Sequence, residues 1–496
     1  MAERGIVLAL DEGTTGATAL AVGLDGDVRG KGYREITQHY PRPGWVEHDA
    51  EEIWAAVQAT AAQALEAAGA KPADVRAIGI TNQRETLVLW DRRTLKPVSR
   101  AIVWQDRRTT AECARLRDEG HEERVREVTG LVLDPYFTAT KAGWAMKHVG
   151  AAAGAAMGTV DSWLVARLSA GRDHVTDASN ASRTLLFDIN EGKWSEEMAQ
   201  LFGVPLDHLP EVRDSSGEVS RSTPDAFGGI AAPVCGIAGD QQAALFGQAC
   251  TQVGMAKNTY GTGSFVLLQT GGDRVASRSG MLTTVAWRRG GRLSYALEGA
   301  IFVTGAALQW LRDGLGIIKT AAEAGPLAAS VPDSGGVYLV PAFVGLGAPH
   351  WDPYARGTIL GLTRGSGRAQ LVRAAVEAMA YQTRDVVEAM ERDSGTRFSE
   401  LRVDGGAVAM DVMCQFQADL LGIPVRRPRR TETTALGAAY LAGLGAGIWS
   451  DSDLGDLWQL DREFTPAMSR DEADTLQDRW RQAVERSRGW LPGDNQ

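Results

Sequence analysis

The common signatures of disulfide, zinc and nucleotide sites are missing from this 496-residue sequence. Its four cysteines show no CxxC spacing, which argues against a disulfide framework and against a thiolate zinc site. No HExxH occurs among the seven histidines, and neither GxxxxGKS/T nor GxGxxG occurs anywhere. A zinc protease, a Walker-type or protein-kinase site and a Rossmann dinucleotide site are therefore not expected.

Positive charge and long apolar runs are also scarce. The chain has 52 Lys and Arg against 62 Asp and Glu, which gives a net charge of −10. An acidic balance without a long basic run argues against nucleic acid or an anionic membrane as the main partner. No apolar run approaches ~20 residues, and the first residues lack the apolar core of a signal peptide. We therefore expect a cytoplasmic protein with no integral membrane segment.

Glycine, in contrast, is abundant, and it gathers in two similar places. Residues 6–10 form an apolar run, followed by a Gly/Thr turn and a second apolar run at 17–22, which is a hairpin pattern. The pattern recurs at residues 255–268, around Gly261-Thr262-Gly263-Ser264. Two such hairpins, half a chain apart, suggest two similarly built halves with a boundary near residue 250, which suits the length.

Strand and helix patterns alternate between and after these hairpins. Residues 50–65 have one apolar helical face behind an Asx cap at Asp49, and residues 369–390 repeat the helical spacing over a longer segment. Strands are predicted at 75–81, 87–90 and 401–404, and helices at 241–249 and 412–421. Alternating strands and helices predict an α/β architecture.

Both Gly/Thr turns can serve as phosphate cradles. Backbone N–H groups in such turns form an anion-binding concavity, and the hydroxyls of Thr14 and Thr15 add donors. Asp11, at the end of the first strand, can hold Mg²⁺ directly or through water. Taken alone, each turn is better interpreted as a hairpin without a ligand, but two loops that face each other across a cleft could hold one nucleotide.

Other polar groups follow strands, where α/β folds place ligands. Asp240 is either a helix cap or a general base for a substrate hydroxyl. Arg84 and Glu85 are either solvated surface or a donor and an acceptor for a polyol. Trp104 and Tyr136 are either core or the walls of a small pocket. Asp404-Gly405-Gly406-Ala407 is either a glycine-requiring turn or an approach for adenine and ribose.

Together these motifs resemble those of the FGGY carbohydrate kinases. The resemblance rests on five segments in the same order, from Val7 to about Trp449: Asp11–Thr15, Thr81–Glu85, Gly239–Gln242, Tyr260–Gly263 and Asp404–Ala407. Gly357–Leu362, with Gln370–Glu377, fits the second family signature, and Tyr136–Trp144 fits the first apart from Ala142. Residues 43–49, 81–85, 130–137 and 236–247 are most similar to the members that phosphorylate glycerol.

The resemblance implies two ribonuclease-H-like (actin/hexokinase-type) domains, 1–250 and 251–496, with the active site in the cleft between them. It implies that ATP and Mg²⁺ phosphorylate glycerol to sn-glycerol 3-phosphate, the entry step of glycerol catabolism, in a homo-oligomer (dimer or tetramer). By analogy the glycerol pocket comprises Arg84, Glu85, Trp104, Tyr136, Asp240, Gln241 and Phe265, with Asp240 as the base. The implied nucleotide residues are Thr14, Thr15, Thr262, Gly305, Gln309, Gly406 and Asp411, and Asp11 is the implied metal ligand.

The sequence departs from the family pattern near the nucleotide. Glu12 replaces a usual Gln, Gly16-Ala17-Thr18 lacks a usual Arg, and Asp411 replaces a common Asn and adds negative charge. Relatives inhibited by fructose 1,6-bisphosphate carry Lys and Arg in a loop that corresponds to residues 222–233, and this chain has neither there. No His lies between His208 and His350, so phosphorylation of a loop histidine is not expected either.

Two alternatives remain from the sequence. One is a kinase for another small polyol or sugar, although the set Arg84, Glu85, Trp104 and Tyr136 favours a three-carbon acceptor. The other is a non-catalytic, actin-like ATP-binding scaffold, which would need neither a base nor a polyol pocket.

Overall fold

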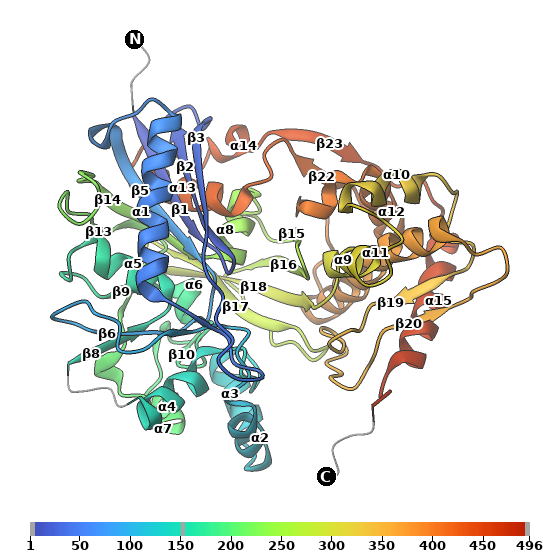
Figure 1. Ribbon diagram of the computed structural model, residues 1–496, viewed down its shortest axis with the longest axis horizontal. Helices are drawn as coiled ribbons and strands as arrows, with labels where there is room; N and C mark the ends of the chain where they lie inside the picture. The colour runs from blue at the N-terminus through green and yellow to red at the C-terminus, as the bar shows by residue number, and fades with distance from the viewer. Residues whose placement is uncertain (1–4, 150–153, 492–496) are drawn as a thin grey trace.

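The computed structural model describes residues 5–149 and 154–491. The first four residues, on which the expectation of no signal peptide partly rests, lie outside this range. Within it, a 13-stranded sheet runs through the molecule in the order β23-β22-β21-β15-β16-β18-β17-β13-β14-β5-β1-β2-β3 (Figure 1). The N-terminal half, blue to green, forms one lobe, and most of the C-terminal half, yellow to red, forms the other.

The first lobe is built on the predicted N-terminal hairpin. Its strands are β1 (Ile6–Glu12), β2 (Gly16–Gly23), β3 (Val28–Glu35), β5 (Val75–Asn82) and β14 (Pro233–Gly239). The turn closes with the N–H of Gly13 donating to the carbonyl of Gly16 at 3.0 Å. β1 is antiparallel to β2 and parallel to β5, which is parallel to β14.

The second lobe repeats this arrangement, as the recurring Gly/Thr hairpin predicted. Its strands are β15 (Met255–Tyr260), β16 (Ser264–Gly271), β18 (Arg292–Ile301), β21 (Glu400–Gly405) and β22 (Val425–Pro428). β15 is antiparallel to β16 and parallel to β21, which is parallel to β22. The sheet order β18-β16-β15-β21-β22 therefore matches β3-β2-β1-β5-β14. Two ribonuclease-H-like units in an α/β protein are confirmed.

Two strands connect the lobes, and helices cover the sheet. β13 (Ser216–Arg221) pairs with β17 (Leu282–Arg289) where Ser216 lies opposite Arg289, and β23 (Leu460–Phe464) forms the far edge. The longer helices are α1 (Ala50–Ala67), α4 (Thr138–His148), α11 (Arg368–Ser394), α12 (Asp411–Leu421), α13 (Thr433–Gly445) and α15 (Arg470–Ser487). The shorter ones are α2 (Thr110–Asp118), α3 (Glu122–Thr129), α5 (Val160–Leu168), α6 (Ala178–Ala181), α7 (Glu196–Phe202), α8 (Asp240–Gly247), α9 (Gly305–Asp313), α10 (Ala324–Ala329) and α14 (Leu454–Leu457).

The remaining strands form small two-stranded sheets. They are β4 (Glu47–His48) with β7 (Ala101–Ile102), β6 (Val88–Asp91) with β8 (Ala155–Gly158), β9 (Val175–Asp177) with β12 (Glu211–Arg213), β10 (Phe187–Asp188) with β11 (Lys193–Trp194), and β19 (Tyr338–Val340) with β20 (Thr358–Leu360). The predicted cap of α1 is confirmed, because a carboxylate oxygen of Asp49 accepts the N–H groups of Glu51 and Glu52.

Each lobe buries an apolar core between its strands and its own long helices. In the first lobe, Leu8, Leu10 and Ile78 pack with residues of α1 and α5. In the second, Val266 and Leu297 pack with residues of α11. No helix in the described part of the chain combines the length and the apolar character needed to span a bilayer.

Helices α8 and α13 cross each other very closely beneath the first lobe. A Cβ on Gly247 would lie 1.9 Å from the carbonyl oxygen of Thr433, and one on Gly437 would lie 1.8 Å from that of Ala243. Only glycine permits this approach. α13 comes from the C-terminal half but packs on β1, β5 and β14 of the first lobe (Figure 1). It thereby fixes α8, the helix that begins at Asp240.

The domain boundary at residue 250 stays a prediction.

Candidate active site

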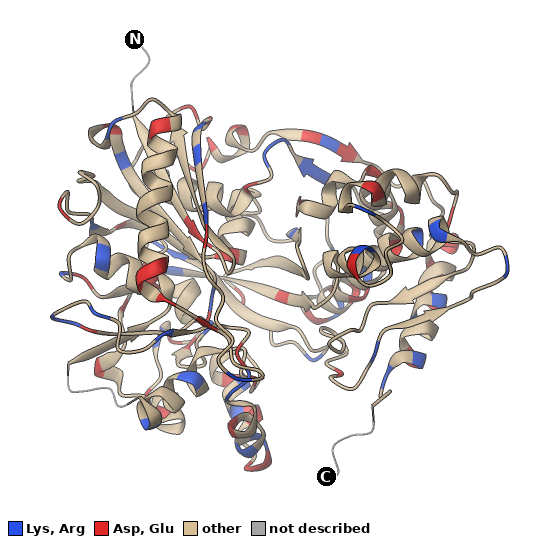
Figure 2. Ribbon diagram, in the orientation of Figure 1, with Lys and Arg blue, Asp and Glu red and all other residues tan. Residues whose placement is uncertain are grey.

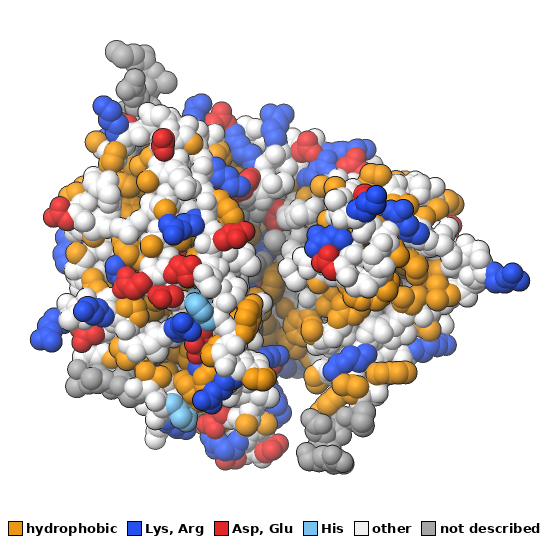
Figure 3. All heavy atoms as spheres, viewed as in Figure 1, with side chains coloured by type: hydrophobic (Ala, Val, Ile, Leu, Met, Phe, Trp, Pro, Cys, Tyr) orange, Lys and Arg blue, Asp and Glu red, His pale blue; other side chains and the backbone are white. Residues whose placement is uncertain are grey.

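The ends of three parallel strands of the first lobe converge where the molecule is hollowed between its lobes (Figure 3). Asp11 lies at the end of β1, Arg84 and Glu85 follow β5, and Asp240 follows β14. Carboxyl ends of parallel strands meet at one edge of a sheet, which is the usual place for a ligand in α/β proteins. The fold thus brings together three motifs that are widely separated in the sequence.

Arg84 is the centre of the site, and its side chain is 2% exposed. Its Nε lies 3.1 Å from Oδ1 of Asp240, and its Nη1 donates to Glu298 at 2.5 Å. Its Nη2 donates to the hydroxyl of Tyr136 at 3.3 Å. A Cβ on Gly239 would lie 2.7 Å from the Arg84 stem, so a larger residue at that position would displace the Arg84 side chain. The guanidinium is therefore held on all sides by protein acceptors.

Glu85 is turned inward by a strained backbone. Its φ is +63°, which is uncommon for a residue other than glycine, and the N–H of Thr86 donates to the carbonyl of Arg84 at 2.7 Å across this tight turn. The Glu85 carboxylate is buried and accepts Nε of Arg183 at 2.7 Å. The alternative that Arg84 and Glu85 are solvated surface is therefore wrong.

Two further residues of this charge cluster, Arg183 and Glu298, were missed by the sequence analysis. Glu298 accepts Nη2 of Arg183 at 2.9 Å and also binds Arg84, and both new side chains are fully buried. Burial alone would raise the pKa of Glu298, but the charges of Arg183 and Arg84 lower it to about 2. The signal that could have revealed Glu298 is a carboxylate within the apolar run of β18, since a buried charge requires a partner.

Three aromatic rings stand around the cluster and connect it to the first turn. Trp104 and Tyr136 meet edge to face, with ring centres 5.4 Å apart. The indole N–H of Trp104 donates to the hydroxyl of Thr14 at 2.9 Å. From the second lobe, the ring centre of Phe265 lies 5.9 Å from the guanidinium carbon of Arg84. The expected polyol residues thus lie together, beside the expected phosphate loop.

Asp240 is the first residue of α8 and not its cap, which is Gly239. One oxygen of Asp240 accepts the N–H of Gln241 at 2.7 Å. Its side chain is 32% exposed, in contrast to Arg84 beneath it. A carboxylate that is anchored on one side and open on the other is placed to accept a proton from a ligand in the hollow.

The second Gly/Thr turn gathers the expected nucleotide residues. The N–H of Thr304 donates to the carbonyl of Thr262 at 2.9 Å, and that of Gly305 donates to Gly261 at 3.0 Å. Gly405 pairs with Tyr260 across the sheet, so Gly406 lies next to the same turn. Gln309 follows one turn along α9 and is exposed. These groups leave a backbone-lined, accessible surface at the edge of the second lobe.

Asp411 lies at the rim of this surface and forms two ion pairs. Its two oxygens contact Arg427 at 2.9 Å and Arg462 at 2.5 Å. Acidic and basic residues alternate along β23, and β22 beside it carries basic residues, as Figure 2 shows. That Asp411 adds negative charge to the nucleotide pocket stays a prediction, and Arg427 and Arg462 lie close enough to offset part of that charge.

The carboxylate of Asp11 fits a divalent cation. Desolvation and the neighbouring Asp240 carboxylate raise the pKa of Asp11 to about 7. Two close carboxylates are stabilised in their ionised form by a cation between or beside them. Mg²⁺ is usually held by one or two carboxylates together with phosphate oxygens and water, and this donor set matches. Among the described residues, no cluster of three or more His, Cys, Asp or Glu side chains forms a metal site.

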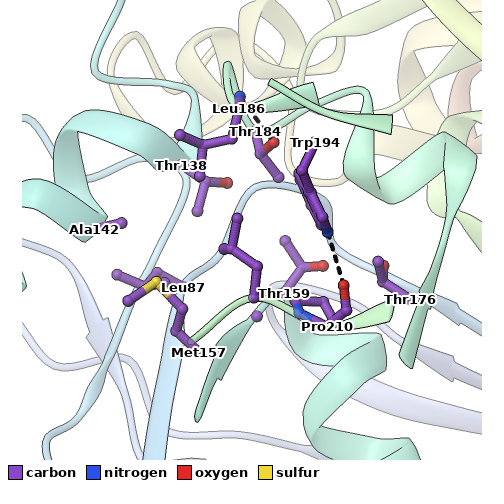
Figure 4. Close-up of a pocket in the computed structure, with 12 residues that line it drawn as sticks. Leu87, Thr138, Ala142, Met157, Thr159, Thr176, Thr184, Leu186, Trp194 and Pro210 are labelled. Carbon is purple, nitrogen blue, oxygen red and sulfur yellow. Dashed lines mark hydrogen bonds between the residues drawn. The ribbon is translucent and has the colours of Figure 1, made fainter. Parts of the chain in front are cut away.

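A small cavity in the first lobe is too narrow to be the ligand site. It has a volume of about 10 Å³ and is lined by Leu87, Thr138, Ala142 and Met157, among others (Figure 4). This is about the space that one water molecule needs, and too little for a polyol. The polar groups expected to bind the ligand are instead those around Arg84 and Asp240.

The two similarly built lobes and the polar cluster between them fit a two-domain kinase of small hydroxylated substrates, and comparison with known proteins supports this. Residues 6–247 match the N-terminal domain of the FGGY family of carbohydrate kinases, and residues 256–446 match its C-terminal domain. The protein belongs to this family.

Several proteins are similar over nearly the whole chain. A glycerol kinase of Trichlorobacter lovleyi is 58% identical over 98% of this chain and 99% of its own length. One of Dechloromonas aromatica is 56% identical over 98% of each chain. The crystal structure of Plasmodium falciparum glycerol kinase with ADP superposes with a TM-score of 0.91 at 33% identity, covering 97% of this chain and 98% of that one.

Proposed function

We propose that the protein transfers the γ-phosphoryl group of ATP to glycerol and releases sn-glycerol 3-phosphate and ADP. The observation that carries the proposal is the open carboxylate of Asp240 in contact with buried Arg84, at the junction of the two lobes. Relatives that are named glycerol kinases and are 54–58% identical over nearly the full chain support glycerol as the acceptor.

Asp240 is the general base in this proposal. Its exposed oxygen takes the proton of the glycerol hydroxyl that attacks the γ-phosphorus, while the Gln241 amide N–H and Arg84 hold its orientation. A glycerol hydroxyl can take over the longest hydrogen bond of Arg84, which Nη2 donates to Tyr136 at 3.3 Å, while the contact of Nε with Asp240 stays in place. Phe265 and Trp104 close the pocket around the carbon chain, which excludes water as a competing acceptor.

ATP lies between the two Gly/Thr turns in the same proposal. Thr14 and Thr15 bind phosphate oxygens from the first lobe, and Thr262 binds them from the second. Gly305, Gln309, Gly406 and Asp411 line the adenosine end, and Asp11 holds Mg²⁺ directly or through water. When bound, Mg²⁺ supplies positive charge that offsets the charge on the transferring phosphoryl group.

A coupled ADP-release assay with five acceptors tests the function. Glycerol, erythritol, dihydroxyacetone, xylulose and gluconate are supplied in turn with Mg²⁺ and ATP. Glycerol is expected to give the highest kcat/KM, because the aromatic walls leave room for a short chain. A higher kcat/KM with xylulose or gluconate would favour the alternative of another carbohydrate kinase. ADP release with none of them would favour the scaffold alternative.

Three accompanying expectations stay predictions. They are a cytoplasmic location, which suits an enzyme that consumes ATP, a homo-oligomeric assembly, and a division into domains at residue 250.

A further inference from the structure

A lysine that the proposed reaction does not use is buried next to the substrate site. Lys257 lies on β15, two strands from the Glu298 strand, and its side chain is fully buried. Its ammonium group donates to Oε1 of Gln241 at 2.5 Å and to the hydroxyl of Thr259 at 2.9 Å. Gln241 belongs to the first lobe and Lys257 to the second, so this contact crosses between the lobes.

The charged environment keeps this ammonium in place. Burial lowers the pKa of Lys257 to about 8, and the carboxylates of Asp404, Asp240 and Glu298 oppose that effect while Arg84 adds to it. At neutral pH the group therefore carries a proton. A protonated lysine has three donors and no acceptor, so it can contact only the oxygen of a side-chain amide.

This chemistry determines which way the Gln241 amide faces. With its oxygen bound to Lys257, the amide must present its nitrogen on the opposite side. Among the described residues, Nε2 of Gln241 forms no hydrogen bond with the protein. It is also not among their fully buried polar atoms that lack a partner. It is therefore accessible, on the residue that follows Asp240, with two N–H donors available.

We infer that Lys257 is a positioning residue that orients the Gln241 amide, so that Gln241 donates a hydrogen bond to a hydroxyl oxygen of the bound polyol. The inference rests on the proposed function and adds one specificity element to it. Asp240 and Glu85 offer only acceptors to the substrate, so a polyol hydroxyl that donates to one of them still needs a donor for its own lone pairs. Gln241, held by Lys257, supplies that donor.

A double-mutant cycle tests the coupling of the two residues. Lys257→Met and Gln241→Met keep side-chain length while removing the ammonium and the amide. Each single variant is expected to raise the KM for glycerol about tenfold, the value of roughly one hydrogen bond, with the KM for ATP changed less than about twofold. The double variant is expected to resemble the worse single variant. Lys193→Met, at a lysine whose side chain is 70% exposed, is the matched control and should behave as wild type.

Additive losses, about a hundredfold in the double variant, would show that Lys257 acts by another route and would overturn the inference. Equal rises in both KM values would do the same, because they indicate a structural role. If Lys257→Met does not fold, Gln241→Glu gives the answer. It keeps an oxygen toward the ammonium but offers no N–H to the hollow, so thermal stability should be maintained while the KM for glycerol rises.

An unchanged KM for glycerol in Gln241→Glu would overturn the inference as well. A wild-type protein that does not phosphorylate glycerol at all would instead refute the proposed function. The two failures are thus distinguished by the wild-type measurement in the same experiment.

Discussion

Nε of Arg84 lies 3.1 Å from Oδ1 of Asp240, which joins a buried cation to a carboxylate at the surface of the hollow. Arg84 is fixed from below by Glu298, on a strand of the other lobe. The orientation of the proposed base therefore depends on residues from both halves of the chain. This arrangement explains how the Asp240 carboxylate, although it lies between two lobes, can be held in one orientation for proton transfer.

Replacement of the proposed base should separate binding from turnover. Asp240→Asn keeps the side-chain shape, so glycerol and ATP should bind normally while kcat falls ~10²–10⁴-fold, the usual contribution of a general base. Steady-state kinetics together with calorimetric binding of both ligands provide the measurement. Asp225→Asn, at an exposed loop position, is the control and should keep full activity. Near-wild-type turnover in Asp240→Asn would show that another group accepts the proton.

Removal of Arg84 should affect glycerol far more than ATP. Arg84→Ala deletes a charged donor, which costs on the order of 1.5–3 kcal/mol of glycerol binding. It also leaves Glu298 with only Arg183, so the unfolding free energy should fall by about 3–5 kcal/mol. Arg84→Lys, which keeps the charge but not the planar fork, separates the two effects and should recover stability more than glycerol affinity. Parallel losses of affinity for both substrates would mean that Arg84 only supports the fold.

The buried carboxylate of Glu298 should make stability depend on acid pH. Its pKa is about 2 in the folded protein, below the ordinary value of 4.5, so the ionised form is favoured by folding. This contribution, on the order of 3 kcal/mol, is complete above pH ~4.5 and is lost as the pH falls toward 2. The difference in unfolding free energy between wild type and Glu298→Gln should therefore shrink from pH 6.5 to pH 3.5. A difference that stays constant over this range would contradict the ion-pair account.

Fructose 1,6-bisphosphate should not inhibit the protein. The loop at residues 222–233 has no Lys or Arg, and Asp225 adds a negative charge. Its backbone is held by internal bonds such as that from the Ser222 hydroxyl to Ile230, and Phe227 is buried against Trp54. Phosphate groups need cationic or convergent N–H partners to offset their desolvation. Titration of the sugar into the glycerol assay is the test, and clear inhibition at sub-millimolar concentrations would mean that it binds elsewhere.

The sequence was sufficient to predict those features of the site that depend on neighbouring residues in the chain. Hairpins with Gly/Thr turns, the cap at Asp49 and the strand-end positions of Asp11, Arg84 and Asp240 all follow from spacing over a few residues. Each of these predictions was confirmed as local structure. The roles of the site residues stay predictions, since proximity does not by itself show chemistry.

The parts that the sequence could not show depend on contacts between distant segments. Arg183, Lys257 and Glu298 look like isolated charges within apolar surroundings, and only the fold reveals that they surround Arg84 and Gln241. Asp411, at the start of α12, likewise pairs with Arg427 and Arg462, which reach it from β22 and β23. Pairing of buried charges follows from physical chemistry, but the identity of the partners is a tertiary property.

Direct detection of the product tests the central claim most clearly. Phosphorus NMR of a reaction that contains the wild-type protein, Mg²⁺, ATP and glycerol should show a new phosphomonoester, formed in equal amount to ADP and identified as sn-glycerol 3-phosphate by a stereospecific dehydrogenase. The same reaction with Asp240→Asn should show almost none. Formation of ADP and inorganic phosphate without the ester, or of ester at wild-type rate in Asp240→Asn, would contradict the account.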